Sequence, residues 1–129
     1  MATIKSFTDT DQSKKLAEIL PLESADMCYR YYSGGMITGY GDCVLAKSFI
    51  TGKNVIREND LPCWSFAALL DILPEYNLQR TNWGNKTEYK IVVTINNYDD
   101  DYNYASKNYD NPLDACVDII ERLHELNLI

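Results

Sequence analysis

The order of hydrophobic and polar residues divides this chain into five segments, which predict a helix, a hairpin, a second helix, a second hairpin and a third helix. The first helix is expected over residues 10–20. Asp9 and Gln12 have the spacing of a capping box, and Pro21 ends the segment. The hydrophobic residues of its buried stripe are Leu16, Ile19 and Leu20.

The first hairpin is predicted from DMCYRYY, residues 26–32, which is rich in residues that favour strands. Ser33, Gly34 and Gly35 provide a turn, and residues 36–40 could return as the partner strand. Residues 41–59 are compatible with a strand or a short helix, so the sequence leaves this segment open.

The second helix is predicted between Leu61 and Pro74, with Pro62 in its first turn and Pro74 as its stop. Its clearly polar residues are Ser65 and Asp71, so we expect this helix to be hydrophobic almost all round. The pattern therefore predicts the central and most buried helix of the fold.

The second hairpin combines residues 77–83 and 88–97 around a turn at Gly84, Asn85 and Lys86. The third helix begins after Asn111, with Pro112 in the first position and Asp114 in the first turn. Its polar face contains Asp114, Asp118, Glu121, Arg122 and Glu125, and its hydrophobic face contains Leu113, Cys116, Val117, Ile120 and Leu123.

These elements predict an α+β fold, a single small domain over residues 1–129, in which about three helices pack on an antiparallel sheet built from hairpins. No run approaches the roughly 18 hydrophobic residues of a membrane span, and the N-terminus lacks the hydrophobic region of a secretory signal. We therefore expect a cytoplasmic protein with no membrane partner.

Three segments of the chain are distinctive: residues 12–29 (QSKKLAEILPLESADMCY), 62–74 (PCWSFAALLDILP) and 110–126 (DNPLDACVDIIERLHEL). Together they resemble a group of small uncharacterised proteins from gut Bacteroidetes genomes and their prophages or other mobile elements. The group has no assigned function, so the resemblance implies a bacterial or phage accessory protein and no site residue.

The net charge of −7 is concentrated in one segment. Residues 97–118 contain six acidic residues and one basic residue, a net charge of −5. This acidity disfavours direct binding of nucleic acid. The acidity is compatible with another function, in which the protein imitates DNA and binds to a nucleic-acid-binding protein in place of DNA.

The candidate binding site lies in the same segment, where tyrosines alternate with Asp and Asn. Tyrosine and short polar residues on a loop are typical of protein-interaction surfaces. The candidate binding residues are Tyr98, Asp99, Asp101, Tyr102, Tyr104 and Tyr109, together with Trp83, the last residue of the second hairpin's first strand. Alternation could equally place some of these tyrosines on the core face of the sheet.

The acidic stretch does not predict a calcium-binding EF-hand. Starting at Asp99, the loop would need glycine where Tyr104 stands, and a strand precedes it instead of a helix. The four cysteines are far apart and there is one histidine, so we expect neither a zinc site nor disulfides. No cofactor is predicted.

A thiol enzyme would use Cys63, in the first turn of the predicted second helix, with His124 as its base. Buried packing is the alternative for Cys63, and no nucleotide-binding or hydrolase motif occurs in the chain. The sequence thus favours a non-catalytic protein-interaction protein with an unidentified partner, as a monomer or homodimer. The alternative is a module that binds or sequesters a small molecule, such as a nucleotide, between the tyrosines and Trp83.

Overall fold

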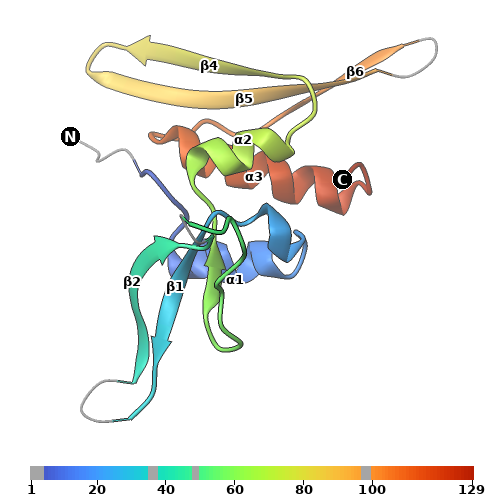
Figure 1. Cartoon of the computed structure of the whole chain (residues 1–129). Coiled ribbons are helices and arrows are strands. Elements are labelled where there is room, and N and C mark those ends of the chain that lie inside the picture. Colours follow the sequence, from blue (N-terminus) through green and yellow to red (C-terminus); the bar gives the residue numbers. More distant parts are fainter. Residues whose placement is uncertain (1–4, 35–37, 48–49, 97–99) are drawn as a thin grey trace. The chain divides into compact units, whose positions relative to one another are not determined.

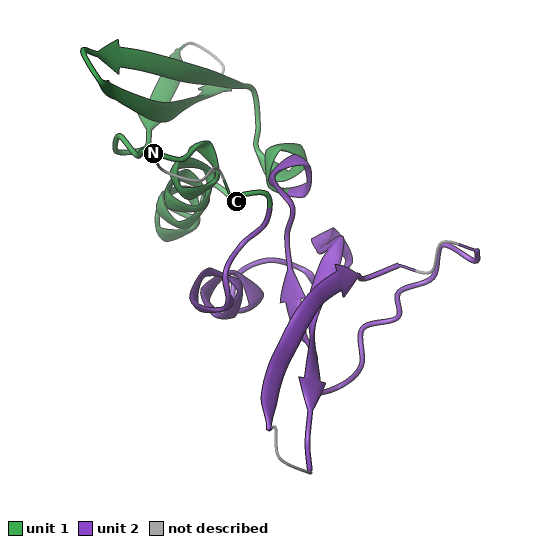
Figure 2. Ribbon diagram, turned by 90° about the vertical axis from the view of Figure 1, so that its left-hand side faces the viewer, with its two compact units in different colours: residues 1–6, 69–129 green, residues 7–68 purple. Residues whose placement is uncertain are grey.

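The structure, a computed structural model, describes residues 5–34, 38–47, 50–96 and 100–129. Within these residues it contains three α-helices and two antiparallel three-stranded sheets, which confirms the predicted α+β class (Figure 1). The chain divides into two compact units, residues 7–68 and residues 1–6 with 69–129 (Figure 2). The expectation of a single domain over residues 1–129 stays a prediction.

The first helix, α1, spans Thr10–Ala17 and lies in the unit of residues 7–68. Its predicted capping box is confirmed, because the Asp9 carboxylate accepts the Gln12 N–H at 2.8 Å and Gln12 Oε1 accepts the Asp9 N–H at 3.1 Å. Leu16 is fully buried. The helix ends before Pro21, and a short 3-10 helix, η1, follows at Leu22–Ser24.

The sheet of this unit has the strand order β2-β1-β3. The predicted first hairpin is present as β1, Met27–Tyr32, paired antiparallel with β2, Gly39–Leu45. The predicted return strand, residues 36–40, overlaps β2 only at residues 39–40. Part of the segment that the sequence left open is therefore strand. A register shift between Tyr29 and Tyr31 interrupts the pairing of β1 with β2.

The predicted second helix is wrong at its beginning. Leu61–Cys63 forms strand β3, and the helix α2 spans only Phe66–Ile72. Pro62 pairs with Cys28 of β1, and a proline is compatible with this position because β3 is at the edge of the sheet. The helix instead begins after Ser65, whose Oγ accepts the Ala68 N–H at 3.1 Å.

The second sheet belongs to the unit of residues 1–6 and 69–129 and has the order β4-β5-β6. The predicted second hairpin is confirmed as β4, Tyr76–Trp83, and β5, Lys86–Asn96. Strand β6, Asp101–Ala105, pairs with the C-terminal half of β5, residues 92–96. Gly84 has φ of 60° in the two-residue turn between β4 and β5, a conformation that favours glycine.

Helix α3, Pro112–Glu125, packs against β5 and β6 on one face of this sheet (Figure 1). Its predicted cap is confirmed, since Asn111 Oδ1 accepts the Leu113 N–H at 2.9 Å. The expectation that the second helix is the most buried is wrong: α2 buries Leu69, whereas α3 buries eight residues. These are Pro112, Leu113, Ala115, Cys116, Val117, Ile119, Ile120 and Leu123.

Candidate protein-interaction surface

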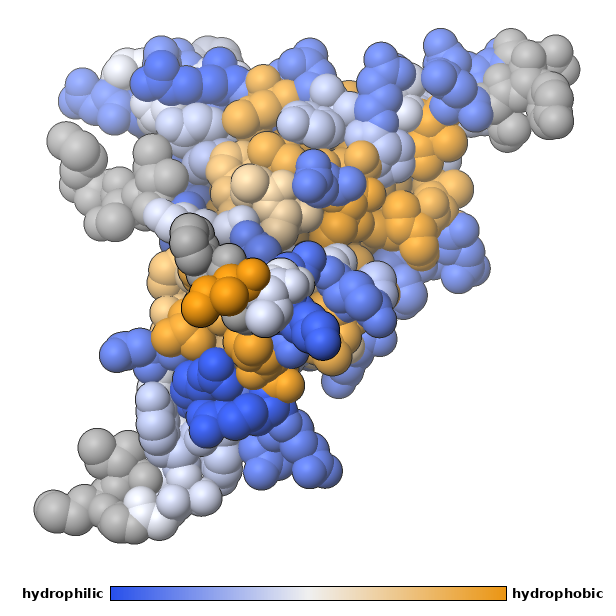
Figure 3. Space-filling model, in the orientation of Figure 1, coloured by the Kyte–Doolittle hydropathy of each residue, from blue (hydrophilic) through white to orange (hydrophobic). Residues whose placement is uncertain are grey.

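Alternation along β5 gives the β4-β5-β6 sheet two chemically different faces. Ile91 and Val93 are fully buried, and they lie on the face that α3 covers. The opposite face has Glu88, Lys90 and Thr94 on β5, with Val92 between the last two. The region of β4 and β5 along the upper margin of Figure 3 is accordingly mostly hydrophilic. We call these the helix face and the polar face.

The tyrosine-rich and aspartate-rich segment forms an edge strand and not a free loop. Asp101, Tyr102 and Tyr104 lie on β6, which pairs with β5 on one side only. Asp101 and Tyr102 are exposed, and Tyr104 is half-buried. The candidate residues Tyr98 and Asp99 lie outside the described residues.

Tyr102 and Tyr104 belong to the helix face of the sheet. The register pairs Tyr104 with Val93 and Tyr102 with Ile95. Tyr102 nevertheless keeps 48% of its surface exposed, at the end of the sheet nearest the β5–β6 connection. The sequence left open whether these tyrosines pack in the core or are exposed on a surface. In the structure Tyr104 is partly packed, whereas the Tyr102 ring is half-exposed.

Trp83 lies far from these tyrosines within the same sheet. It pairs with Lys86 beside the β4–β5 turn, whereas Tyr102 pairs with Ile95 at the other end of β5. Trp83 is on the polar face, and 69% of its surface is exposed. The structure therefore does not bring Trp83 and the tyrosines of β6 together into one cleft.

Tyr109 connects the end of this segment to the sheet. Its backbone exchanges two hydrogen bonds with Tyr89 of β5, at 2.6 and 2.9 Å. Burial raises the pKa of the Tyr109 hydroxyl, and the neighbouring Asp118 carboxylate raises it further. Asp118 also accepts the Lys107 N–H at 2.9 Å, so this acidic side chain of α3 holds the segment that follows β6.

Two further exposed residues on β4 were missed in the sequence analysis. Tyr76 and Leu78 lie on the helix face, opposite Val93 and Ile91, with 42% and 39% of their surfaces exposed. All eight residues of β4 are exposed. Both faces of β4 consist mainly of polar side chains. This pattern in the sequence could have indicated an exposed edge strand.

The thiol candidate Cys63 is a fully buried residue of β3. Its sulfur donates to the Thr8 carbonyl at 3.3 Å and lies 3.3 Å from the sulfur of Cys43. Because Cys63 is in a strand, the helix-dipole argument for an activated thiol is wrong. Burial raises the pKa of the Cys43 thiol, and its hydrogen bond to Cys63 adds to that effect. His124 is an exposed residue in the last turn of α3.

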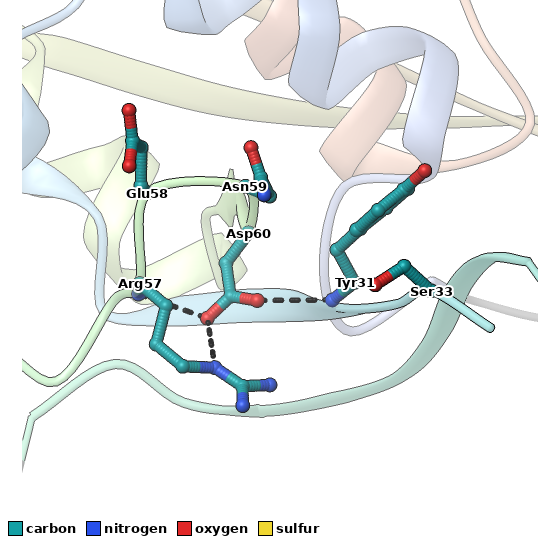
Figure 4. A pocket seen from close by; sticks show the side chains of 6 residues that line it. All are labelled: Tyr31, Ser33, Arg57, Glu58, Asn59 and Asp60. Atoms are coloured by element: carbon teal, nitrogen blue, oxygen red, sulfur yellow. Dashed lines mark hydrogen bonds and ion pairs between the residues drawn. The ribbon is translucent and has the colours of Figure 1, made fainter.

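A small pocket lies beside Asp60 in the unit of residues 7–68. Its volume is about 220 Å³, and its lining is Tyr31, Ser33, Arg57, Glu58, Asn59 and Asp60 (Figure 4). Both Asp60 carboxylate oxygens already accept hydrogen bonds, Oδ1 from the Tyr31 N–H and Oδ2 from the Arg57 N–H and from Arg30. The pocket is polar and smaller than the roughly 300 Å³ typical of ligand sites.

Among the described residues, no group of three or more His, Cys, Asp or Glu side chains could hold a metal ion. No helix in the same part of the chain is long and apolar enough to cross a membrane. No family model, no curated protein and no solved structure matches this chain.

Proposed function

We propose that this chain is a non-catalytic protein-interaction protein and that it binds its partner through β6. The observation that supports this function best is the position of Tyr102, a half-exposed ring on a strand that pairs on one side only. Such amphipathic rings supply much of the binding energy of protein interfaces.

The edge of β6 offers backbone hydrogen bonds next to these rings. The Ser106 N–H donates to the Ile91 carbonyl at 2.9 Å, so Ser106 and Ile91 form a hydrogen-bonded pair. Hydrogen-bonded and non-hydrogen-bonded pairs alternate along an antiparallel ladder. Tyr102 and Tyr104 therefore direct their backbone groups toward β5, whereas Asp101, Asn103 and Ala105 direct theirs outward. An extended segment of a partner could pair with these outward groups, as in β-strand addition.

The charge of the segment supports a basic partner. Asp100 and Asp101 lie at the beginning of β6, within the stretch that has a net charge of −5. Opposite charge increases the rate and selectivity of association more than its final strength. The resemblance to mobile-element proteins supports an accessory role for the bacterium or phage that encodes the chain.

The test is affinity capture from the source cells followed by a binding titration with the purified partner. We expect Tyr102→Ala to weaken binding at least about tenfold, the typical cost of losing an aromatic hot spot. Trp83→Ala is the matched control, because Trp83 is exposed on the polar face at the other end of the sheet, and it should bind normally. Undiminished binding by a folded Tyr102→Ala, Tyr104→Ala double variant would exclude this surface.

A further inference from the structure

Strand β4 is the least protected of the four sheet edges in the described residues. It pairs along its whole length of eight residues with β5, without a bulge, and its only charged residue is Arg80. The other edges are shorter or irregular: β3 has three residues, β6 has five, and β2 has a register shift against β1. Proteins usually protect a long edge with lysine, proline or a bulge, and β4 has none of these.

The register of the hairpin shows which backbone groups of β4 point away from β5. In a two-residue hairpin, the residues that flank the turn form a hydrogen-bonded pair, here Trp83 and Lys86. The Thr94 N–H donates to the Glu75 carbonyl at 2.8 Å, which confirms the same alternation at the far end. The residues that direct their N–H and C=O groups away from β5 are therefore Tyr76, Leu78, Arg80 and Asn82.

We infer that β4 pairs antiparallel with β4 of a second copy of this chain, around a two-fold axis at Gln79, to form a homodimer with a continuous six-stranded sheet. Tyr76 then pairs with Asn82 of the second copy, and Leu78 pairs with Arg80. Each of the four outward residues meets an outward residue, so the strands exchange about eight hydrogen bonds. The interface is isologous and closes after two copies.

The side chains select this register over its neighbours. A shift of two residues toward the hairpin turn would place Arg80 opposite Arg80 of the second copy, and like charges directly opposite each other are destabilising. A shift of two residues the other way would require Pro74 to pair, although proline has no N–H. Only the register centred on Gln79 pairs all four outward residues without either fault.

The same register covers exposed hydrophobic surface. Leu78 lies opposite the aliphatic part of Arg80 from the second copy, on the helix face. On the polar face Trp83 lies opposite Glu75 of the second copy, and Gln79 faces its own symmetry mate. The exposed fractions of 39% for Leu78 and 69% for Trp83 should both decrease in the dimer.

The first test measures the mass of the full-length protein by sedimentation velocity over a range of concentrations. We expect a concentration-dependent dimer, and we expect Arg80→Pro to weaken it at least about tenfold. This proline removes an outward N–H in each copy and none of the hydrogen bonds between β4 and β5. Arg80→Ala keeps the N–H and is the matched control, which should still dimerise. A monomeric wild type, or an Arg80→Pro variant that dimerises as the wild type does, would overturn the inference.

A second test does not depend on how well the proline variant folds. In the inferred dimer Gln79 faces Gln79 in a non-hydrogen-bonded pair, where the two Cα atoms are about 4.5 Å apart. Oxidised glutathione should convert the two thiols of a Gln79→Cys dimer into one disulfide between the copies, with release of two molecules of reduced glutathione. Asn77→Cys faces Thr81 and should remain unlinked. A dimer that does not link through Gln79→Cys, or that links equally through Asn77→Cys, would use another surface or register.

Discussion

The guanidinium of Arg30 donates from Nη1 to Oδ2 of Asp60 at 2.8 Å, and the Asp60 side chain is 1% exposed. The same oxygen accepts the Arg57 N–H at 2.9 Å, and Oδ1 accepts the Tyr31 N–H at 2.9 Å. One carboxylate thus joins β1 to the segment that precedes β3. Asp60 makes these contacts although it lies in a stretch without regular secondary structure.

Asp60→Asn should lower the free energy of unfolding by about 3 kcal/mol, because it leaves buried donors and the Arg30 charge without a carboxylate. Urea denaturation followed by circular dichroism would measure the difference. Asp42→Asn, at an exposed position of β2, is the control and should stay within about 0.5 kcal/mol of the wild type. An equal effect of both substitutions would contradict the assigned role of Asp60.

The contribution of Asp60 should also depend on pH. Burial opposes its charged form, but hydrogen bonds from the N–H groups of Tyr31 and Arg57 outweigh burial and hold the pKa of Asp60 below its usual 3.8. The resulting stabilisation is complete above the unfolded pKa and is lost as the pH falls through the folded pKa. The difference in unfolding free energy between wild type and Asp60→Asn should therefore shrink as the pH falls below about 4. A constant difference over that range would show that the Asp60 charge contributes nothing.

Asp9→Ala should destabilise the protein by about 1 kcal/mol, the usual cost of removing an N-cap side chain. The substitution removes the carboxylate that accepts the Gln12 N–H, whereas the backbone N–H at position 9 can still donate to Gln12 Oε1. Thermal denaturation would detect the change. Asp11→Ala removes an exposed acidic residue from the same turn without removing the cap, and it should cost less.

The folded protein should react slowly with a thiol-specific disulfide reagent at neutral pH. Cys28, Cys63 and Cys116 are fully buried, and burial raises the pKa of Cys116 to about 12. Cys43 is partly exposed and should be modified first, while all four cysteines should react at once in denaturant. Rapid modification of Cys63 in the folded state, located by peptide mass spectrometry, would restore the case for a reactive thiol.

Local signals in the sequence were sufficient for several elements. The capping box at Asp9, the cap at Asn111 and the turn at Gly84 each depend on residues within a few positions of one another. Helix α3 was also predictable, because its hydrophobic residues repeat at helical spacing and end up buried as that pattern requires.

The errors arose where long-range pairing decides the structure. Pro62 has the local surroundings of a helix start, but Leu61–Cys63 pairs with β1, more than thirty residues earlier in the chain. A short hydrophobic run does not distinguish a strand from a helix by periodicity alone. The place of Tyr102 on an edge strand likewise depends on its pairing with Ile95, which composition does not reveal.

The two faces of the β4–β5 hairpin also limit how its length can change during evolution. One residue inserted between Tyr76 and Leu78 would place these two side chains on opposite faces of the hairpin, so that they could not both remain beside the buried Ile91 and Val93. Adding one residue pair to each strand next to the turn would preserve both faces. We therefore expect natural variants of this hairpin to be longer or shorter by whole pairs, with any bulge confined to the turn.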